Sequence, residues 1–392
     1  MLSLKNVSPN GPIAKMSEVM VDSTSVVLFE TVELSGGKQL GLITLNVEKT
    51  LNSLSLEMVD LIHPQLARWE RDEAIGLVMF QGAGDRAFCA GGDIQNLYHD
   101  MVAHPGGPCP YCEAFFEREY RLDYYLHNYS KPTIVWAHGV VMGGGLGIAS
   151  ACDFRIGTEK TRIAMPEITI GLIPDAGATW SFMQMDEHWA YFLAWTGAAI
   201  NGADALRVKL VNALINHSDR QDFIDDLASA DWGAPAQQVI SNVIDKFEQK
   251  RQDFPASQIA NHEKIVKEVI AECLQSDNPV ATLIRNMSQL SGDSWLEKAA
   301  ATFSHGAPTT AEIIYRQFQL AKTMSQKEMF QMELTLAVQC SRHPDFAEGV
   351  RALLIDKDNQ PSWEYAVMGE VPASWIDEHF ENPWDNHPMA DL

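Results

Sequence analysis

The sequence predicts an α/β protein in which strand and helix units repeat, followed by a helical C-terminal region. Three observations lead to this fold class. From Ser25 to Gly171, short apolar or β-branched segments alternate with longer segments that have helical spacing. Beyond Ala203, strand signals almost vanish and apolar residues recur at helical spacing. The chain has 392 residues, of which 46% are hydrophobic, so it can bury a large core.

The first unit begins with a predicted strand pair. The segments SVVLFETVEL and KQLGLITLNV, which start at Ser25 and Lys38, are β-branched with period-two patterning, and the intervening SGG is typical of a hairpin. A helix is predicted next, in SLSLEMVDLIHPQLARWERD, with Ser55 as its N-cap. Pro64 is expected to kink or break this helix, because proline cannot donate to the helical hydrogen-bond ladder.

Similar units follow along the chain. IGLVMFQG predicts a buried strand, and a helix is expected from Asp93 after the loop GAGDRAFCAGGD. YCEAFFEREYRLDYYLHNYS predicts a long amphipathic helix, and SKPTIVWAHG predicts the next buried strand. MGGGLGIASACDFRIGT then predicts a further turn, helix and strand.

The C-terminal part is predicted to be mainly helical, and a polar interruption marks where it begins. HSDRQD interrupts the apolar pattern between residues 218 and 223. We therefore expect a flexible leader over residues 1–24, an α/β core over 25–218 and a mainly helical region over 219–392. The expected helices are GADALRVKLVNALI, QQVISNVIDKFEQKR, QIANHEKIVKEVIAECLQ, AEIIYRQFQLAKTM and EMFQMELTLAVQCSRH.

The charge and the apolar segments exclude two classes of partner. The net charge of −23 disfavours nucleic-acid binding, which depends on neutralising phosphates with Lys and Arg. The apolar segments are too short, or too interrupted by glycine, to cross a bilayer, so no membrane partner is expected. The first 20 residues lack a continuous apolar core and a cleavage site. We therefore expect a cytoplasmic protein.

The chain contains 6 cysteines, which are scattered and are expected to be reduced thiols. Cys109 and Cys112 form the motif CPYC, which resembles a thioredoxin-like redox site. Such a site needs a strand before it and a helix after it, whereas CPYC follows the loop AHPGGP. A redox site is therefore disfavoured, and so is a zinc site, because no second ligand pair follows.

Two glycine-rich stretches each follow a predicted buried strand and precede a helix. They are AFCAGGD, over Ala87–Asp93, and HGVVMGGGLG, over His138–Gly147. Backbone N–H groups at a helix N-terminus attract negative charge, and two such donors that converge form an oxyanion hole. Alternatively, the glycines only allow close packing of helix on strand. Neither stretch has the pattern of a nucleotide-phosphate loop.

A third stretch, MPEITIGLIPDAGAT, places Glu167 and Asp175 in an otherwise apolar segment. An ionised carboxylate that is buried without a partner is costly, so such acids are usually paired, exposed or functional. Two structural alternatives remain open. Asp175 follows a proline and would make a good helix N-cap, and Glu167 could form a salt bridge at the surface.

These three motifs, in this order, resemble the crotonase (enoyl-CoA hydratase/isomerase) superfamily. The resemblance runs from Ser25 to Trp363 and includes the tail motif FAEGVRALLIDKDNQPSW. Within the superfamily, the chain is most similar to the 3-hydroxyisobutyryl-CoA hydrolase branch. The resemblance implies a crotonase-like spiral of repeated ββα units, with the helical C-terminal region covering the edge of the active site.

The resemblance also implies roles for particular residues. Gly92 and Gly144 match the two positions whose N–H groups hold the thioester carbonyl oxygen. Glu167 matches the catalytic glutamate of the later motif, and Asp175 matches an acid that the hydrolase branch has eight residues further on. Glu119 matches a substrate-contacting glutamate.

Four further positions follow from the same motifs. Gly147 stands where hydratases have another catalytic glutamate, so ordinary hydratase activity is disfavoured. Ala87 and Ala90, in the first glycine motif, are further candidate substrate contacts. Arg86 is a candidate for binding the anionic end of coenzyme A.

Other residues of chemical interest have simpler interpretations. His138 could act as a base, but a histidine bonded to backbone at a strand end is favoured. Cys89 is expected to be a small buried thiol. Asp356 and Asp358 could resemble a metal pair, but no metal is implied by the family.

The activity that the resemblance implies is hydrolysis of a short-chain 3-hydroxyacyl-CoA, 3-hydroxyisobutyryl-CoA, to the free acid and coenzyme A, as in valine degradation. No cofactor is expected, because coenzyme A is part of the substrate. Glu167 would activate water or attack the carbonyl itself, and Asp175 would accept a hydrogen bond from the 3-hydroxyl. The alternatives are an enoyl-CoA hydratase or isomerase, and a non-catalytic acyl-CoA-binding homologue. The family also allows a homo-oligomer.

Overall fold

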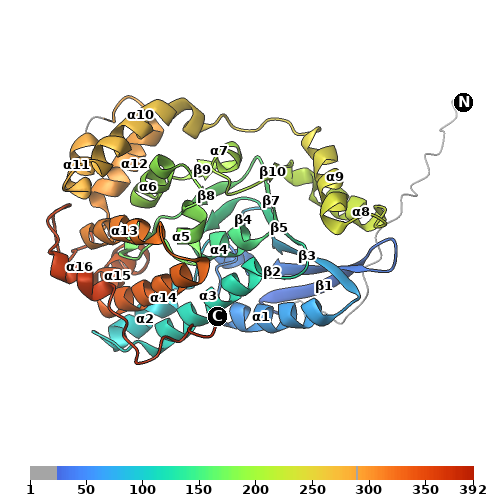
Figure 1. Cartoon of the computed structure of the whole chain (residues 1–392), viewed down its shortest axis with the longest axis horizontal. Coiled ribbons are helices and arrows are strands. Elements are labelled where there is room, and N and C mark those ends of the chain that lie inside the picture. The colour runs from blue at the N-terminus through green and yellow to red at the C-terminus, as the bar shows by residue number, and fades with distance from the viewer. Residues whose placement is uncertain (1–23, 288–289) are drawn as a thin grey trace, which may run out of the picture.

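A computed structural model describes residues 24–287 and 290–392 of the chain (Figure 1). The predicted flexible leader over residues 1–24 lies outside these residues, except for Thr24. In the described part of the chain, no helix combines the length and the apolar character needed to cross a membrane.

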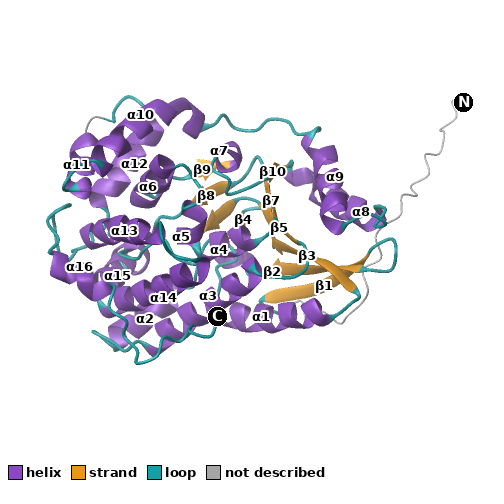
Figure 2. Ribbon diagram, in the orientation of Figure 1, coloured by secondary structure: helices purple, strands orange, loops and turns teal. Residues whose placement is uncertain are grey.

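Two sheets lie at the centre of the molecule, with helices around them (Figure 2). The 6-stranded sheet has the order β1-β2-β3-β5-β7-β10, and the 4-stranded sheet has the order β4-β6-β8-β9. Neighbouring strands are parallel, except for the antiparallel pairs β1–β2 and β8–β9. The strands are β1 (Val27–Glu33), β2 (Gln39–Leu45), β3 (Ile75–Gly82), β4 (Ala87–Cys89), β5 (Thr133–Ala137), β6 (Val140–Met142), β7 (Phe154–Gly157), β8 (Arg162–Ala164), β9 (Ile200–Asn201) and β10 (Ala213–Leu214).

Sixteen α-helices and four shorter helical segments are described. The α-helices are α1 (Leu56–Arg71), α2 (Ile94–Ala103), α3 (Pro110–His127), α4 (Gly144–Ala151), α5 (Ala178–Phe182), α6 (Glu187–Thr196), α7 (Gly202–Arg207), α8 (Arg220–Ser229), α9 (Ala236–Glu248), α10 (Gln258–Leu274), α11 (Pro279–Met287), α12 (Ser294–His305), α13 (Pro308–Ala321), α14 (Gln326–Arg342), α15 (Pro344–Val350) and α16 (Ala373–His379). The short segments are the 3₁₀ turns η1 (Glu48–Thr50), η2 (Glu167–Ile170) and η3 (His217–Asp219) and the π-helix η4 (Arg351–Ile355).

The predicted repetition of ββα units is confirmed. Each unit has one strand in the 6-stranded sheet, the next strand in the 4-stranded sheet, and then helical structure. The units are β3–β4 with α2 and α3, β5–β6 with α4, and β7–β8 with η2 and α5. Because β4, β6 and β8 are adjacent and parallel, their carboxyl ends meet at one edge of the 4-stranded sheet.

The first helix begins as predicted but is not broken. The Ser55 Oγ accepts from the Met58 N–H at 3.2 Å and caps α1. The expected break at Pro64 is wrong, because α1 runs from Leu56 to Arg71 with the proline inside it. Five apolar residues of α1 are buried in the core, namely Met58, Val59, Ile62, Leu66 and Trp69. Their burial outweighs the backbone hydrogen bond that proline cannot make.

The segment GADALRVKLVNALI is not the single helix that its pattern predicts. Helix α7 ends at Arg207, and Lys209 has a positive φ of 64°, which turns the chain. Ala213 and Leu214 then form β10, which pairs with β7. The edge of β7 offers hydrogen-bond partners to the backbone N–H and C=O groups of these two residues. Pairing with a strand distant in sequence therefore overrides the local helical pattern.

The C-terminal helices share hydrophobic clusters with the N-terminal half. Figure 1 shows α14 and α15 beside α2 and α3, and buried residues of these four helices and of α13 belong to one cluster. Helices α8 and α9 pack on the 6-stranded sheet, where Phe223 and Phe247 join its buried side chains. The division into a core over 25–218 and a helical region over 219–392 stays a prediction.

Candidate functional site

The edge where β4, β6 and β8 end carries three of the predicted functional residues. Gly92 follows β4, Gly144 follows β6 and Glu167 follows β8. Glu119 comes from α3, and Asp175 comes from the loop before α5. All five residues line one cavity of about 880 Å³, a size within the usual range for small-molecule sites. The structure therefore brings together residues that lie far apart in the sequence, up to the 83 positions between Gly92 and Asp175.

The second glycine motif allows the chain to pass very close to an acid. Gly143 has a φ of 48°, a conformation that favours glycine, and α4 begins at the next residue. A Cβ atom on Gly144 would lie 1.9 Å from Oε1 of Glu119. Gly144 is the first residue of α4, so its N–H is one of those that have no partner inside the helix. This N–H is suited to an anion in the cavity.

The first glycine motif orients a second N–H. The Leu54 N–H donates to the Gly91 carbonyl at 2.7 Å, and the Asp93 N–H donates to the Leu54 carbonyl at 2.9 Å. Gly92 is the residue paired with Leu54 in this parallel bridge, in which the two neighbours of Gly92 make the hydrogen bonds and its own N–H does not. The N–H of Gly92 therefore points away from Leu54. Because Gly92 and Gly144 both line the cavity, they form a candidate oxyanion hole.

Glu167 lies at the start of η2 and is only 5% exposed. Its Oε2 has no hydrogen-bond partner among the described residues. Burial raises the pKa of Glu167 well above its usual value, and the nearby charge of Asp175 raises it further. The alternative of a salt bridge at the surface is wrong, because the side chain is buried in the cavity wall.

Asp175 is also 5% exposed, and the Tyr120 hydroxyl donates to its Oδ2 in a short hydrogen bond. Burial raises the pKa of Asp175 to about 6, although the bond from Tyr120 acts in the opposite direction. The alternative role as a helix N-cap is wrong, since Gly177 holds that position in α5. Glu333 of α14 instead accepts the N–H groups of Gly177 and Thr179, each at 2.7 Å.

Helix α3 carries two buried acids one turn apart, of which Glu119 lines the cavity and Asp123 does not. Glu119 is 2% exposed and Asp123 is 0% exposed. Oε1 of Glu119 and both carboxyl oxygens of Asp123 have no hydrogen-bond partner among the described residues. Burial raises the pKa of both groups well above the usual range, and the neighbouring charges that add to this effect are acidic. These acids therefore favour their protonated forms.

Sequence reasoning missed three residues around the site: Tyr120, Asp123 and Glu333. The helical spacing of Glu119 and Asp123 on an apolar face could have indicated Asp123. Glu333 lies on α14, and its partners at the start of α5, Thr179 and Gly177, are 154 and 156 positions away along the chain. No local signal could have indicated that contact.

Gly147 lies where the family has a second glutamate, and the structure leaves no room for one. A Cβ atom at this position would lie 2.7 Å from the Ala176 carbonyl oxygen and 2.9 Å from Oδ2 of Asp123. A larger side chain would need the α4 backbone or Asp123 to move. The expected departure from the hydratase pattern is therefore built into the packing.

Three substrate-binding candidates near the first glycine motif differ in position. Ala90 lines the cavity, whereas Ala87 and Arg86 do not. Ala87 is 1% exposed in β4, and its carbonyl accepts from Nδ2 of Asn52 at 3.0 Å. The Arg86 carbonyl accepts from the Val140 N–H at 3.0 Å. Ala87 is buried in β4 away from the cavity, whereas Arg86 has an exposed side chain, and its contact with the anionic end of coenzyme A stays a prediction.

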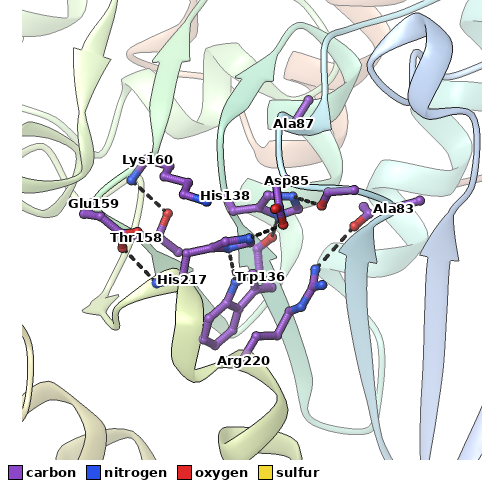
Figure 3. A network of polar contacts seen from close by, with 12 residues as sticks. Ala83, Asp85, Ala87, Trp136, His138, Thr158, Glu159, Lys160, His217 and Arg220 are labelled. Atoms are coloured by element: carbon purple, nitrogen blue, oxygen red, sulfur yellow. Dashed lines mark hydrogen bonds and ion pairs between the residues drawn. The ribbon is translucent and has the colours of Figure 1, made fainter.

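A polar network holds the connection that leads from β3 to the first glycine motif. Figure 3 shows the imidazole of His217 between Trp136 and Asp85. Its Nδ1 accepts from the Trp136 indole N–H at 3.2 Å, and its Nε2 donates to Asp85 at 3.0 Å. Arg220 also donates to the Gly82 carbonyl, at 3.4 Å. The network therefore fixes the β3–β4 connection without lining the cavity.

The simpler interpretations of His138 and Cys89 are confirmed. His138 stacks on His217 with ring centroids 4.5 Å apart, and its ring nitrogens lie 3.3 and 3.0 Å from the carbonyls of Trp136 and Gly84. Burial lowers its pKa to about 4. Cys89 is completely buried, and burial raises its pKa to about 12.

The CPYC motif is not arranged as a redox site. Cys109 precedes α3 at the end of a loop, and Cys112 lies in the first turn of that helix. Both thiols are buried, and burial raises the pKa of Cys109 to about 11 and raises that of Cys112 even further. Thiolate formation is therefore strongly disfavoured. All six cysteines lie in the described ranges, and none forms a disulfide.

The two acids of the tail motif form an ion-pair network. Asp356 and Asp358 accept from the Arg351 guanidinium at 2.7 and 2.8 Å. Arg351 also donates twice to Glu348, at 2.8 Å each. Arg351 therefore neutralises the charge of both aspartates, and no metal is needed to account for their proximity.

One other cluster has side chains that could ligate a metal. Among the described residues, ligand atoms of Asp186, His188 and Glu263 lie within 4.8 Å of one another. The two oxygens of Glu263 already accept from His188 at 2.9 Å and from the Trp189 indole at 2.8 Å. Arg207 and Lys209 line the same hollow and supply positive charge. Glu263 is therefore already partnered without a cation.

Comparison with known proteins identifies the family. Residues 40–380 match the enoyl-CoA hydratase/isomerase family. A zebrafish (Danio rerio) protein named mitochondrial 3-hydroxyisobutyryl-CoA hydrolase is 34% identical over 361 residues, which cover 91% of this chain and 90% of the relative. The human protein of the same name is 34% identical over 342 residues, covering 87% and 86% of the two chains.

Solved structures give the same family by fold. A carnitinyl-CoA dehydratase from Mycobacterium thermoresistibile superposes with a TM-score of 0.80 at 28% identity, covering 93% of this chain and 98% of the other. An enoyl-CoA hydratase from Rhodobacter sphaeroides has a TM-score of 0.77 at 26% identity, covering 91% and 97%. With its ββα spiral and glycine-lined cavity, this chain belongs to the enoyl-CoA hydratase/isomerase (crotonase) family.

Proposed function

We propose that this protein hydrolyses 3-hydroxyisobutyryl-CoA, a short-chain 3-hydroxyacyl-CoA thioester, to the free hydroxy acid and coenzyme A. The relatives with 34% identity over most of the chain carry the name of this activity. One structural observation supports the proposal most directly. Glu167 is buried in the same cavity wall as Gly92 and Gly144, so one carbonyl group can meet both the acid and the amides.

The chemistry needs few groups, because a thioester is already an activated acyl group. The N–H groups of Gly92 and Gly144 would donate to the carbonyl oxygen as negative charge develops on it. Ionised Glu167 would attack the carbonyl carbon, or would remove a proton from a water that attacks it. The C–S bond then breaks, and the thiolate of coenzyme A takes up a proton. With direct attack, a water molecule cleaves the resulting anhydride and restores Glu167.

The acids around Glu167 explain how it can serve as a base. Its raised pKa makes it a strong base once it is ionised. The pKa of Asp175 is near 6, and Asp175 lines the same cavity. Asp175 is the acid that would accept a hydrogen bond from the 3-hydroxyl group of the substrate.

Two alternatives are less well supported. Enoyl-CoA hydratase activity fits the names of the solved structures, but Gly147 and its surroundings exclude the second glutamate of that mechanism. A non-catalytic acyl-CoA binder would not need buried acids beside the glycines. Coenzyme A is part of the substrate, so the proposal includes no cofactor and no metal.

Location and assembly stay predictions. The named relatives are mitochondrial proteins, and the cytoplasmic location expected for this chain has no support from them. A homo-oligomer is compatible with the proposal, and no nucleic-acid partner is included in it.

The test is a thiol-release assay with purified protein and 3-hydroxyisobutyryl-CoA. Glu167→Gln keeps the size of the side chain but removes its basicity, so we expect a loss of at least about 100-fold in kcat. Glu268→Gln, at an exposed position on α10, is the matched control and should keep full activity. Undiminished release by Glu167→Gln would exclude the role of this residue. Hydration of crotonyl-CoA without thiol release would favour the hydratase alternative.

A further inference from the structure

Tyr120 is buried next to the cavity but does not line it. The side chain is 0% exposed, and its ring lies 5.7 Å from that of Phe116, centroid to centroid. A buried phenol needs a hydrogen-bond partner, and here the partner is Oδ2 of Asp175. Tyr120 follows Glu119 directly on α3. The same helix therefore supplies one acid of the cavity, Glu119, and the hydroxyl that donates to a second acid, Asp175.

Asp175 has a side chain that needs such a contact to be oriented. The terminal torsion of an aspartate is broad and nearly two-fold, so the carboxylate is poorly fixed by its own rotamer. Its loop contains two residues with positive φ, Ala176 at 55° and Gly177 at 80°. The hydroxyl of Tyr120 occupies one carboxyl oxygen, and this leaves the other for the cavity.

This arrangement has a consequence for the acyl group. An ionised carboxylate only accepts hydrogen bonds, and a hydroxyl group on the substrate can donate one. A substrate that lacks the hydroxyl would leave the buried oxygen without a partner, which is costly. A carboxylate that is free to rotate could turn away from such a substrate and would discriminate less.

We propose that Tyr120 is a positioning residue, which holds Asp175 so that the enzyme prefers an acyl group with a 3-hydroxyl. The inference rests on the proposed function, because it assigns specificity to the same site. Tyr120 itself acts through Asp175 and does not touch the substrate.

A second consequence concerns pH. The titratable groups that interact with Asp175 come from α3 (Glu119, Tyr120 and Asp123), η2 (Glu167) and α14 (Glu333 and Cys340). The hydrogen bond from Tyr120 is the side-chain contact that lowers the pKa of Asp175, which is about 6. Loss of this hydroxyl should therefore move the ionisation of Asp175 to higher pH.

The test compares two substrates in two variants. Tyr120→Phe removes only the hydroxyl, and Tyr125→Phe removes the same kind of bond elsewhere, from Tyr125 to Glu70 on α1. For each protein, kcat/KM is measured for 3-hydroxyisobutyryl-CoA and for isobutyryl-CoA. We expect Tyr120→Phe to reduce the preference for the hydroxylated substrate at least 10-fold, mainly through the loss of activity on that substrate. Tyr125→Phe should keep the preference.

The pH profile provides a readout that a purely structural defect would not move. For 3-hydroxyisobutyryl-CoA, the acid limb of kcat/KM should shift to higher pH in Tyr120→Phe and not in Tyr125→Phe. An unchanged preference together with an unchanged acid limb would overturn the inference.

A double-mutant cycle keeps the inference testable if Tyr120→Phe folds poorly. Asp175→Asn should itself lose the preference, and adding Tyr120→Phe to it should cause no further loss. A further loss would contradict the inference.

If the wild type hydrolyses neither thioester, the proposed function is wrong. In that case, calorimetry measures the affinities of the protein for 3-hydroxyisobutyryl-CoA and isobutyryl-CoA. The inference then requires that the wild type binds 3-hydroxyisobutyryl-CoA more tightly and that Tyr120→Phe loses this difference.

Discussion

At the site, the backbone of Gly144 lies so close to the carboxyl group of Glu119 that no side chain fits between them. Any side chain at position 144 would meet Oε1 of Glu119, which lies 1.9 Å from the position of a Cβ atom. That oxygen is the end of a flexible side chain, so the fold can survive the collision while the N–H of Gly144 is displaced. The glycine is therefore required by the site more than by the fold.

We predict that Gly144→Ala folds but loses activity. Displacement of one oxyanion donor should reduce kcat by roughly 100- to 1,000-fold, as for other oxyanion holes. Thiol release and thermal unfolding are measured on the same preparation. Gly76→Ala is the control, because its Cβ would lie 3.4 Å from Lys38 and should be tolerated. Full activity of Gly144→Ala would show that this amide does not bind the oxyanion.

At the scale of elements, α14 holds the loop that carries Asp175. Glu333 is 0% exposed and accepts the N–H groups of Gly177 and Thr179 at the start of α5. The short helix α5 has no side-chain cap of its own, so a helix distant in sequence satisfies its first N–H groups. Burial raises the pKa of Glu333 to about 7.

We predict that Glu333→Ala destabilises the protein and weakens catalysis. Two buried N–H groups would lose their acceptor, which should lower the free energy of unfolding by roughly 2–4 kcal/mol. Glu333→Gln keeps one acceptor oxygen and should lose about half as much. Urea denaturation measures the stability, and Glu268→Ala on the exposed face of α10 is the control. Equal stability of Glu333→Ala and the control would contradict the capping role.

Across the part of the molecule that the structure describes, several Asp and Glu side chains are buried, whereas no Lys or Arg is. Glu119, Asp123 and Glu167 have a pKa raised well above the usual range by burial, so they keep protons that the unfolded chain has lost. A carboxyl group with a raised pKa lowers the stability as the pH rises from its unfolded to its folded pKa. His127, His138 and His379, each with a pKa lowered to about 4, act in the opposite sense. Their effect is nearly complete above about pH 7.5, where almost all unfolded histidines are also neutral.

We predict that the free energy of unfolding falls as the pH rises from about 7.5, while the buried acids still hold their protons in the folded state. Each acid that remains protonated only in the folded state contributes about 1.4 kcal/mol per pH unit. Urea denaturation at several pH values measures the slope. Asp123→Asn removes one of these protons while keeping the shape of the side chain, so the slope should become shallower. A stability that is constant or rises over this range would rule out the buried protonated acids.

The glycine motifs and the acids near them could be predicted because their roles depend on local backbone. A glycine between a strand and a helix exposes N–H groups whatever surrounds it, and this made the two glycine motifs recognisable. The resemblance to the crotonase family then indicated Gly92 and Gly144 within them. Glu167 and Asp175 were recognisable because they interrupt an apolar segment. The break at Pro64 and the single helix at residues 202–215 were predicted wrongly, since burial in the core and pairing with β7 override local preference.

The sequence by itself therefore determined the alternation of strands and helices up to Gly171 and the residues that offer amides or acids to a site, whereas the ββα unit was implied by the resemblance. The tertiary structure alone decided which of those residues meet. It placed Gly92, Gly144 and Glu167 together because β4, β6 and β8 are parallel neighbours that end at one edge. It left Arg86 and Ala87 outside the cavity lining, and it added Tyr120, Asp123 and Glu333 behind the cavity. The reason is physical: backbone conformation is set by a few neighbouring residues, whereas the pKa and orientation of a buried acid depend on groups that only the packed fold brings near.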